Sequence, residues 1–128
     1  MKLKIDTKEK FTVLTPEEPI ISANMTEDIE KICGYASLSI PHVVINMKMI
    51  NEIDDESAKR FSFIQQQFYE KNASLVICEM IPAVEAVFEK LELTDVMNIT
   101  PTESEAWDIV QMEEIERELL GDIDDEEK

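Results

Sequence analysis

Glycine and histidine are scarce in this 128-residue sequence, and each shortage excludes a class of chemistry. The two glycines, Gly34 and Gly121, lie in no glycine-rich motif, so the chain cannot build a phosphate-binding loop. The single histidine, His42, opens an apolar segment and has no serine or cysteine partner placed to act as a nucleophile. We interpret His42 as a structural residue at the edge of a strand, and we predict that the protein is not an enzyme.

Cysteine and long apolar runs are also in short supply. Cys33 and Cys78 lie in apolar surroundings and form no CxxC motif, which is typical of buried, reduced thiols in a cytoplasmic protein. No apolar run approaches the roughly 20 residues of a membrane-spanning helix, and the charged start at residues 2–6 is unlike a signal peptide. We therefore expect a soluble, cytoplasmic protein with no membrane insertion.

Basic residues are outnumbered by acidic ones, 12 against 29, which gives a net charge of −17. Such a field repels phosphate backbones, so we expect no nucleic-acid partner and instead a protein partner with a basic face. The hydrophobic fraction of 44% is enough for one globular core.

The spacing of apolar residues predicts strands and helices that alternate through the middle of the chain. Strands are expected at residues 2–6, 10–15, 20–21, 42–47, 74–78 and 96–99. Helices are expected to begin near Asn24, Asp55, Pro82 and Thr102, with capping boxes formed by Asn24 with Glu27 and by Thr102 with Glu105. This order predicts a single α/β domain with a mostly parallel or mixed sheet of four to five strands and about four helices.

Three of the expected helices have a clear inward stripe at helical spacing. The stripes comprise Ala58, Phe61, Ile64, Gln65 and Phe68; Val84, Val87, Phe88 and Leu91; and Ala106, Ile109 and Val110.

After Val110 the stripe of the last helix drifts, so that Met112, Ile115 and Leu119 occupy a different face. Residues 113–128 carry nine acidic and two basic residues. We therefore divide the chain into a domain at residues 1–112 and an acidic helical extension at residues 113–128, with residues 121–128 disordered.

The stretch from residue 43 to residue 71 is the most suggestive of a site. It begins as a strand that is apolar on both faces and ends as a helix that opens on Asp54, Asp55 and Glu56. Carboxylates are favoured there because the first N–H groups of a helix lack intrahelical partners. Consecutive carboxylates point in different directions, however, and do not have the spacing of a cation loop, so we predict no metal and no cofactor. A phosphoacceptor-aspartate signalling domain is excluded, because the paired acids and the lysine that it needs are missing.

Several segments in this order resemble the STAS domain family, over about residues 2–112. The matching segments are Val43-Val44-Ile45-Asn46, Ile53-Asp54-Asp55-Glu56-Ser57, Ala73 to Cys78, Ile81-Pro82-Ala83-Val84, Leu91-Glu92-Leu93 and Ile99 to Ala106. The family includes the anti-sigma factor antagonists of bacterial partner-switching pathways, which regulate transcription. The resemblance implies a non-catalytic signalling domain that docks onto a serine-kinase-type anti-sigma factor through Asp54, Asp55, Glu56 and Ser57.

This sequence departs from the family pattern at the residue that is phosphorylated. Asp55 stands at the position of the phosphorylatable Ser or Thr, Glu56 replaces a small residue and Ser57 replaces a glycine. A carboxylate forms no stable phosphate ester and carries one negative charge where phosphoserine carries nearly two. Asp55 either holds the domain in a permanently phosphorylated-like state or marks the loss of the switch. Ser57 is the substitute phosphosite, which three neighbouring carboxylates disfavour, and Asp54 or Asp55 also suits an N-cap.

A structural role is the alternative. A STAS-like chain can serve as an assembly subunit of a larger complex, such as a transporter or a sensory array. The stripe of Met112, Ile115 and Leu119 favours this role, since it offers an apolar surface to a partner or to a second copy. The stripe is also typical of a frayed, partly packed final helix. We expect a monomer or a weak homodimer.

Overall fold

A mixed sheet of five strands forms the centre of the molecule. The computed structural model describes residues 2–34 and 42–127, and the side chains of residues 2–32 and 42–120. The strands, in their order across the sheet, are β1 (Leu3–Thr7), β2 (Thr12–Pro16), β4 (Val43–Asn46), β6 (Leu75–Cys78) and β7 (Ile99–Thr100). β1 and β2 form an antiparallel hairpin, and β2, β4, β6 and β7 are parallel. The α/β class and the mixed sheet predicted from the sequence are confirmed.

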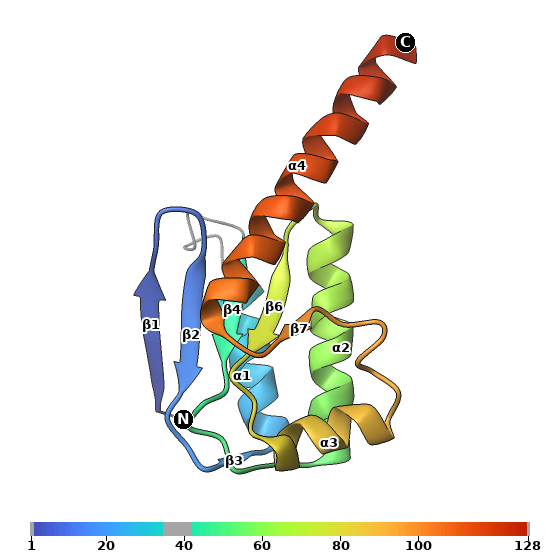
Figure 1. Cartoon of the computed structure of the whole chain (residues 1–128). Coiled ribbons are helices and arrows are strands. Elements are labelled where there is room, and N and C mark those ends of the chain that lie inside the picture. Colours follow the sequence, from blue (N-terminus) through green and yellow to red (C-terminus); the bar gives the residue numbers. More distant parts are fainter. Residues whose placement is uncertain (1, 35–41, 128) are drawn as a thin grey trace.

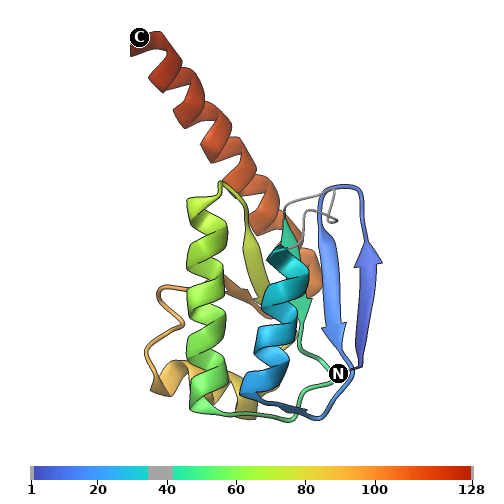
Figure 2. The same ribbon diagram turned by 180° about the vertical axis from the view of Figure 1, so that it is seen from behind.

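Four helices in the described part of the chain cover the sheet. They are α1 (Ala23–Gly34), α2 (Asp55–Glu70), α3 (Pro82–Lys90) and α4 (Glu103–Glu127). α1 and α2 lie side by side on one face, α4 crosses the other face, and α3 lies near the end where α2 begins (Figures 1 and 2).

Alternating residues of the strands feed two separate cores. Leu14, Ile45 and Ile77 point toward α1 and α2, whereas Val44 and Val76 point toward α4. All four residues of β4 are buried, as expected for a central parallel strand with both faces covered. The sequence of β4 is apolar on both faces because a separate layer of helices covers each face of the sheet.

The inward stripes predicted for the helices are confirmed. Ala58, Phe61, Ile64 and Phe68 of α2 are buried, and so are Val84 and Phe88 of α3. Ala106 and Val110 are buried against the sheet, with Ile109 partly buried beside them. Gln65 is half-buried and uses its amide to accept a hydrogen bond from the Asn98 backbone N–H at 2.8 Å.

Two local predictions are wrong. The strand expected at residues 96–99 lies instead at Ile99–Thr100, which is β7. Val96 and Met97 are not part of it, because their backbone N–H groups both donate to the Leu93 carbonyl in a turn. α1 begins at Ala23, so Asn24 lies within its first turn and is not the cap. Thr102 does cap α4, since its hydroxyl accepts from the Glu105 N–H at 3.2 Å.

A second, two-stranded sheet was not predicted in full. β3 (Ile20–Ile21) pairs in parallel with β5 (Glu52–Ile53) below the start of α2. β5 has too few residues to show a strand pattern. Its residues form a strand because they lie beside β3 and pair with it. This small sheet fixes the path of the chain into α2.

Candidate functional site

The connection from β4 to α2 lies at the carboxyl edge of the parallel strands, where sites in open α/β sheets are usually found. Met47 and Ile50 are fully buried and anchor this connection in the core. The N–H groups of Asn51 and Glu52 donate to the Pro19 carbonyl at 2.7 and 3.0 Å. The start of α2 is therefore held by packing on one side and by β3 on the other.

Asp54 is the N-cap of α2. Its backbone is extended, with φ −87° and ψ 167°, and its carboxylate accepts the Ser57 N–H at 2.7 Å. This contact satisfies one of the unpaired N–H groups of the first turn and contributes about 1 kcal/mol to helix stability. Of the two caps that the sequence allowed, the structure selects Asp54.

Asp55 and Glu56 project into solvent at the first turn. The Asp55 carboxylate lies 2.8 Å from the Lys90 ammonium at the end of α3, and the two side chains are 51% and 62% exposed. An ion pair this exposed adds little to stability, about 0–1 kcal/mol. Its importance is local, because Lys90 offsets part of the Asp55 charge at the start of α2.

Ser57 lies beneath this surface and not on it. The residue is fully buried, and its hydroxyl has no hydrogen-bond partner among the described residues. A kinase cannot reach this hydroxyl while the first turn of α2 is formed. We therefore place the candidate docking surface on Asp54, Asp55 and Glu56, with Ser57 as its buried floor.

The unpartnered hydroxyl leads to a stability prediction. Ser57→Ala is expected to raise the free energy of unfolding by about 1 kcal/mol, because a buried hydroxyl without a partner is destabilising. The control is Ser62→Ala, a half-buried position on the same helix, which gains only the helix propensity of alanine, about 0.5 kcal/mol. Urea unfolding followed by circular dichroism measures both; a less stable Ser57→Ala would mean that the hydroxyl has a partner.

Two exposed apolar residues near this surface were not recognised in the sequence. Ile20, which pairs with Glu52, is 53% exposed, and Met49 in the β4–α2 connection is 48% exposed. Ile20 lies in the short strand expected at residues 20–21, and Met49 lies just beyond the strand expected at residues 42–47, so neither position had a spacing that indicated its exposure. With the three carboxylates they give this end of the molecule a mixed apolar and acidic character.

A polar network ties the same edge of the sheet to α4. The Asn46 amide donates to Glu103 at 3.0 Å, and the Glu103 N–H donates to the Glu79 carboxylate at 2.9 Å. Glu79 has a left-handed backbone, with φ 61°, which is uncommon for a residue other than glycine. Glu79 thereby caps the start of α4, and the network acts as structural support for the carboxyl edge.

A second polar cluster, which we call the α4 clasp, joins α4 to the opposite edge of the sheet. It consists of His42, Ser74, Asn98, Glu113, Glu114 and Arg117. Ser74 donates its hydroxyl to Glu113 at 2.6 Å, and Arg117 donates to the Ala73 carbonyl and to the Ser74 hydroxyl, both at 2.9 Å.

His42 is a buried structural residue of the clasp, as the sequence predicted. Its Nδ1 accepts the Ser74 N–H at 3.1 Å, and its Nε2 lies 3.4 Å from Glu114. Burial lowers the pKa of His42 below its usual value, although Glu114 opposes the shift. The ring is therefore neutral at pH 7, with its proton on Nε2.

Other candidate chemistry finds little support in the described residues. Burial raises the pKa of the Cys78 thiol to about 12, so this cysteine is an inert core residue, as expected; the Cys33 side chain lies outside the described part. No group of three or more His, Cys, Asp or Glu side chains within the described ranges could hold a metal ion. No helix in the described chain has the length and apolar character needed to cross a membrane.

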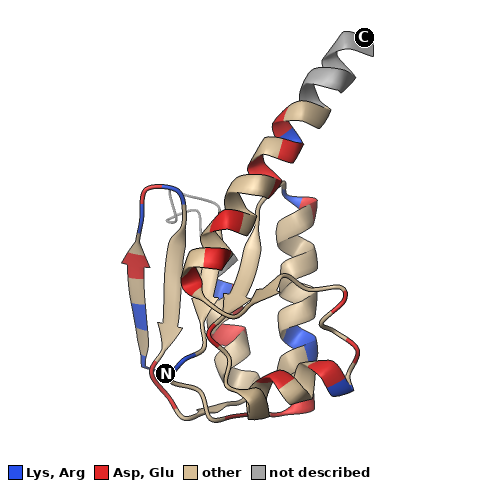
Figure 3. Ribbon diagram, in the orientation of Figure 1, with Lys and Arg blue, Asp and Glu red and all other residues tan. Residues whose placement is uncertain are grey.

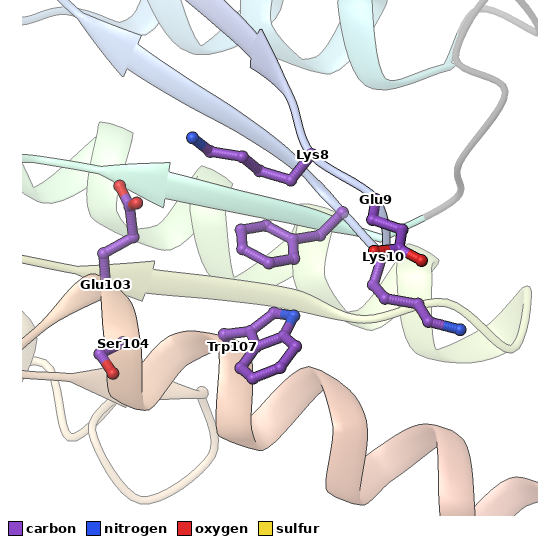
Figure 4. A pocket seen from close by; sticks show the side chains of 7 residues that line it. Lys8, Glu9, Lys10, Glu103, Ser104 and Trp107 are labelled. Carbon is purple, nitrogen blue, oxygen red and sulfur yellow. The ribbon is translucent and has the colours of Figure 1, made fainter.

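An open pocket of about 470 Å³ lies between the β1–β2 hairpin and the start of α4 (Figure 4). Phe11 and Trp107 form its apolar part, and lysines and glutamates mix around its rim. Lys8 lies 2.9 Å from Asp6, so its charge already has a partner. We find no convergent set of polar groups here that would select a ligand.

Comparison with known proteins agrees with this architecture. The STAS domain family model matches residues 2–106. TM1081 of Thermotoga maritima, described as a candidate anti-sigma factor antagonist, has a similar structure with a TM-score of 0.72 and 17% sequence identity; the match covers 85% of this chain and 94% of that chain. The anti-sigma factor antagonist SpoIIAA from Bacillus, in its unphosphorylated form, has a TM-score of 0.65 and 18% sequence identity; the match covers 86% of this chain and 96% of that chain.

A domain of a much larger protein has the same fold. The murine Slc26a9 anion transporter matches 80% of this chain over 18% of its own, with 11% identity and a TM-score of 0.62. No curated protein is significantly similar in sequence. The match over residues 2–106, carried by the fold described above, shows that the chain belongs to the STAS domain family.

Proposed function

We propose that this chain is a non-catalytic docking domain of a partner-switching pathway, and that its partner is a serine-kinase-type anti-sigma factor. The observation that carries the proposal is the start of α2, where Asp54, Asp55 and Glu56 are exposed on a rigid, well-anchored turn. Exposed Ile20 and Met49 supply apolar contact area nearby. Recognition would thus combine a small apolar area with acidic groups that select a basic partner surface.

We further propose that this docking surface is not switched by phosphorylation at residue 55. SpoIIAA, which has a similar structure, exists in unphosphorylated and phosphorylated forms. In this proposal residue 55 takes the phosphoacceptor position, and its side chain is a carboxylate whose single charge is partly offset by Lys90 at 2.8 Å. This pairing favours loss of the switch over a permanent phosphorylated-like state, because phosphoserine carries nearly two negative charges.

Substitution of Asp55 tests both parts of the proposal. We expect the wild-type chain to bind a purified anti-sigma kinase from its own organism equally well with and without ATP. Asp55→Ser should retain binding without ATP, but should accept phosphate and lose affinity by tenfold or more, about 1.4 kcal/mol, when ATP is present. Isothermal titration calorimetry and mass spectrometry measure the two effects.

Two further variants locate the surface. Neutralising its flanks together, Asp54→Asn with Glu56→Gln, should weaken binding, whereas Asp28→Ser, an exposed carboxylate on α1, should not. Indifference of the kinase to the Asp54/Glu56 pair and to Asp55→Ser would refute docking at the start of α2. Phosphorylation of the wild-type chain by the kinase would refute the absence of a switch.

A further inference from the structure

α4 carries an apolar stripe that is exposed on the surface of the described fold. Met112, Ile115 and Leu119 are 59%, 56% and 59% exposed. Their spacing of three and four residues places them on one face of the helix, which we call the α4 stripe. This face is opposite the one that packs Ala106 and Val110 against the sheet.

The α4 clasp fixes the rotation of the helix, so the stripe is held outward and is not a frayed end. Glu113 and Arg117 lie on the same helical face as Val110, and both contact Ser74 just before β6. Glu113 also accepts from the Asn98 amide at 3.0 Å. A rotation of α4 that buried Ile115 would break every one of these contacts.

Charges along α4 determine what can cover the stripe. Exposed Glu116 and Glu118 border it on opposite sides, and exposed Asp108 lies at its N-terminal end. Arg117 is the only basic residue between residues 103 and 120, and it is engaged in the clasp. Acidic residues accordingly recur along α4 from Glu103 to Glu118 (Figure 3).

A second copy of the chain is a poor occupant of this surface. Antiparallel packing of two α4 stripes would bring Glu116 and Glu118 of one copy against the same residues of the other. Like charges that border an apolar helical seam oppose pairing, and opposite charges favour it. The α4 stripe is therefore complementary to a helix that has the same apolar spacing and is bordered by basic residues.

We propose that the α4 stripe docks a basic amphipathic helix of a protein partner. Leucine or isoleucine side chains of that helix would pack on Met112, Ile115 and Leu119, while its Lys or Arg side chains would pair with Glu116 and Glu118. This is a recognised mode of helix binding. The surface is separate from the start of α2, which lies at the other end of the molecule (Figure 1), and the inference does not rest on the proposed function.

Binding of the full chain to two synthetic helical peptides tests the inference. Both peptides carry leucines at alternating spacings of three and four residues. In one peptide the residues that border the leucines are lysines, and in the other they are glutamates. We expect saturable binding of the lysine peptide only, weakening as salt is raised. Ile115→Ser should reduce that affinity about tenfold or more, because it removes the central apolar contact.

Matched variants separate the stripe from general acidity. Phe63→Ser, at an α2 side chain with a similar exposure of 54%, should leave the affinity unchanged, as should Asp55→Ser. Glu116→Lys with Glu118→Lys should reverse the preference between the two peptides. The proposal is overturned if the wild type shows no saturable binding, if Phe63→Ser matches Ile115→Ser, or if light scattering finds a dimer that Ile115→Ser dissolves.

Discussion

Phe61→Ala is expected to lower the free energy of unfolding by about 3–5 kcal/mol, a large part of the stability of a domain this size. Phe61 is fully buried on the inner face of α2, where it packs in the core beneath α1 and α2. Removing the ring leaves a cavity between the helix and the sheet that the fixed neighbouring layers cannot close. Urea unfolding measures the loss as a lower midpoint with an unchanged slope.

Phe63 provides the control on the same helix. It lies two residues further along α2 with 54% of its surface exposed, so Phe63→Ala should change stability by only about 0.5 kcal/mol. Equal losses from the two substitutions would mean that α2 presents a different face to the core. The proposed docking surface would then be misplaced as well, because the rotation of α2 determines where Asp55 and Glu56 project.

The α2 face could be predicted from the sequence because it depends on spacing alone. Ala58, Phe61, Ile64 and Phe68 recur at intervals that only one helical face can satisfy, and the same logic located α3 and the beginning of α4. The central strand was equally clear, since β4 is apolar on both faces. Local periodicity was therefore sufficient to predict most of the fold.

Features that depend on contacts between distant segments were not predictable in the same way. β5 is strand only because it meets β3, and the turn at Val96 and Met97 shortened β7 from its expected length. The burial of Ser57, in contrast, follows from local spacing, because Ser57 lies four residues before Phe61 and seven before Ile64 on the inner face of α2.

The docking surface at the start of α2 and the α4 stripe differ in how far they could be recognised from the sequence. The acidic start of α2 is contiguous in the chain, so its carboxylates were visible together, although Ile20 and the Lys90 partner of Asp55 were not. The drift of apolar residues after Val110 was visible too, but its meaning was open between a frayed helix and a surface. The clasp decides this for the described residues, because it connects α4 to groups from 15 positions earlier in the chain (Asn98 to Glu113) to 72 positions earlier (His42 to Glu114).

Arg117→Ala is expected to cost about 1.5–3 kcal/mol of stability, the range for hydrogen bonds to charged groups. The substitution removes two hydrogen bonds of 2.9 Å and leaves Glu113, 24% exposed, without the cation 3.6 Å away. Arg117→Lys should recover only part of the loss, since a single ammonium cannot reproduce the planar donor group. Glu118→Ala, which alters an exposed residue outside the clasp, should be nearly neutral.

The consequence for α4 is specific and measurable by hydrogen exchange. In Arg117→Ala, backbone amides from about residue 110 onward should exchange faster while those of α2 keep their protection, because the clasp holds α4 locally. Affinity for the lysine-bordered peptide should fall with it, since an α4 that can rotate no longer presents Ile115 in one direction. Uniformly faster exchange would instead show that Arg117 supports the whole fold, and unchanged peptide binding would show that the stripe needs no clasp.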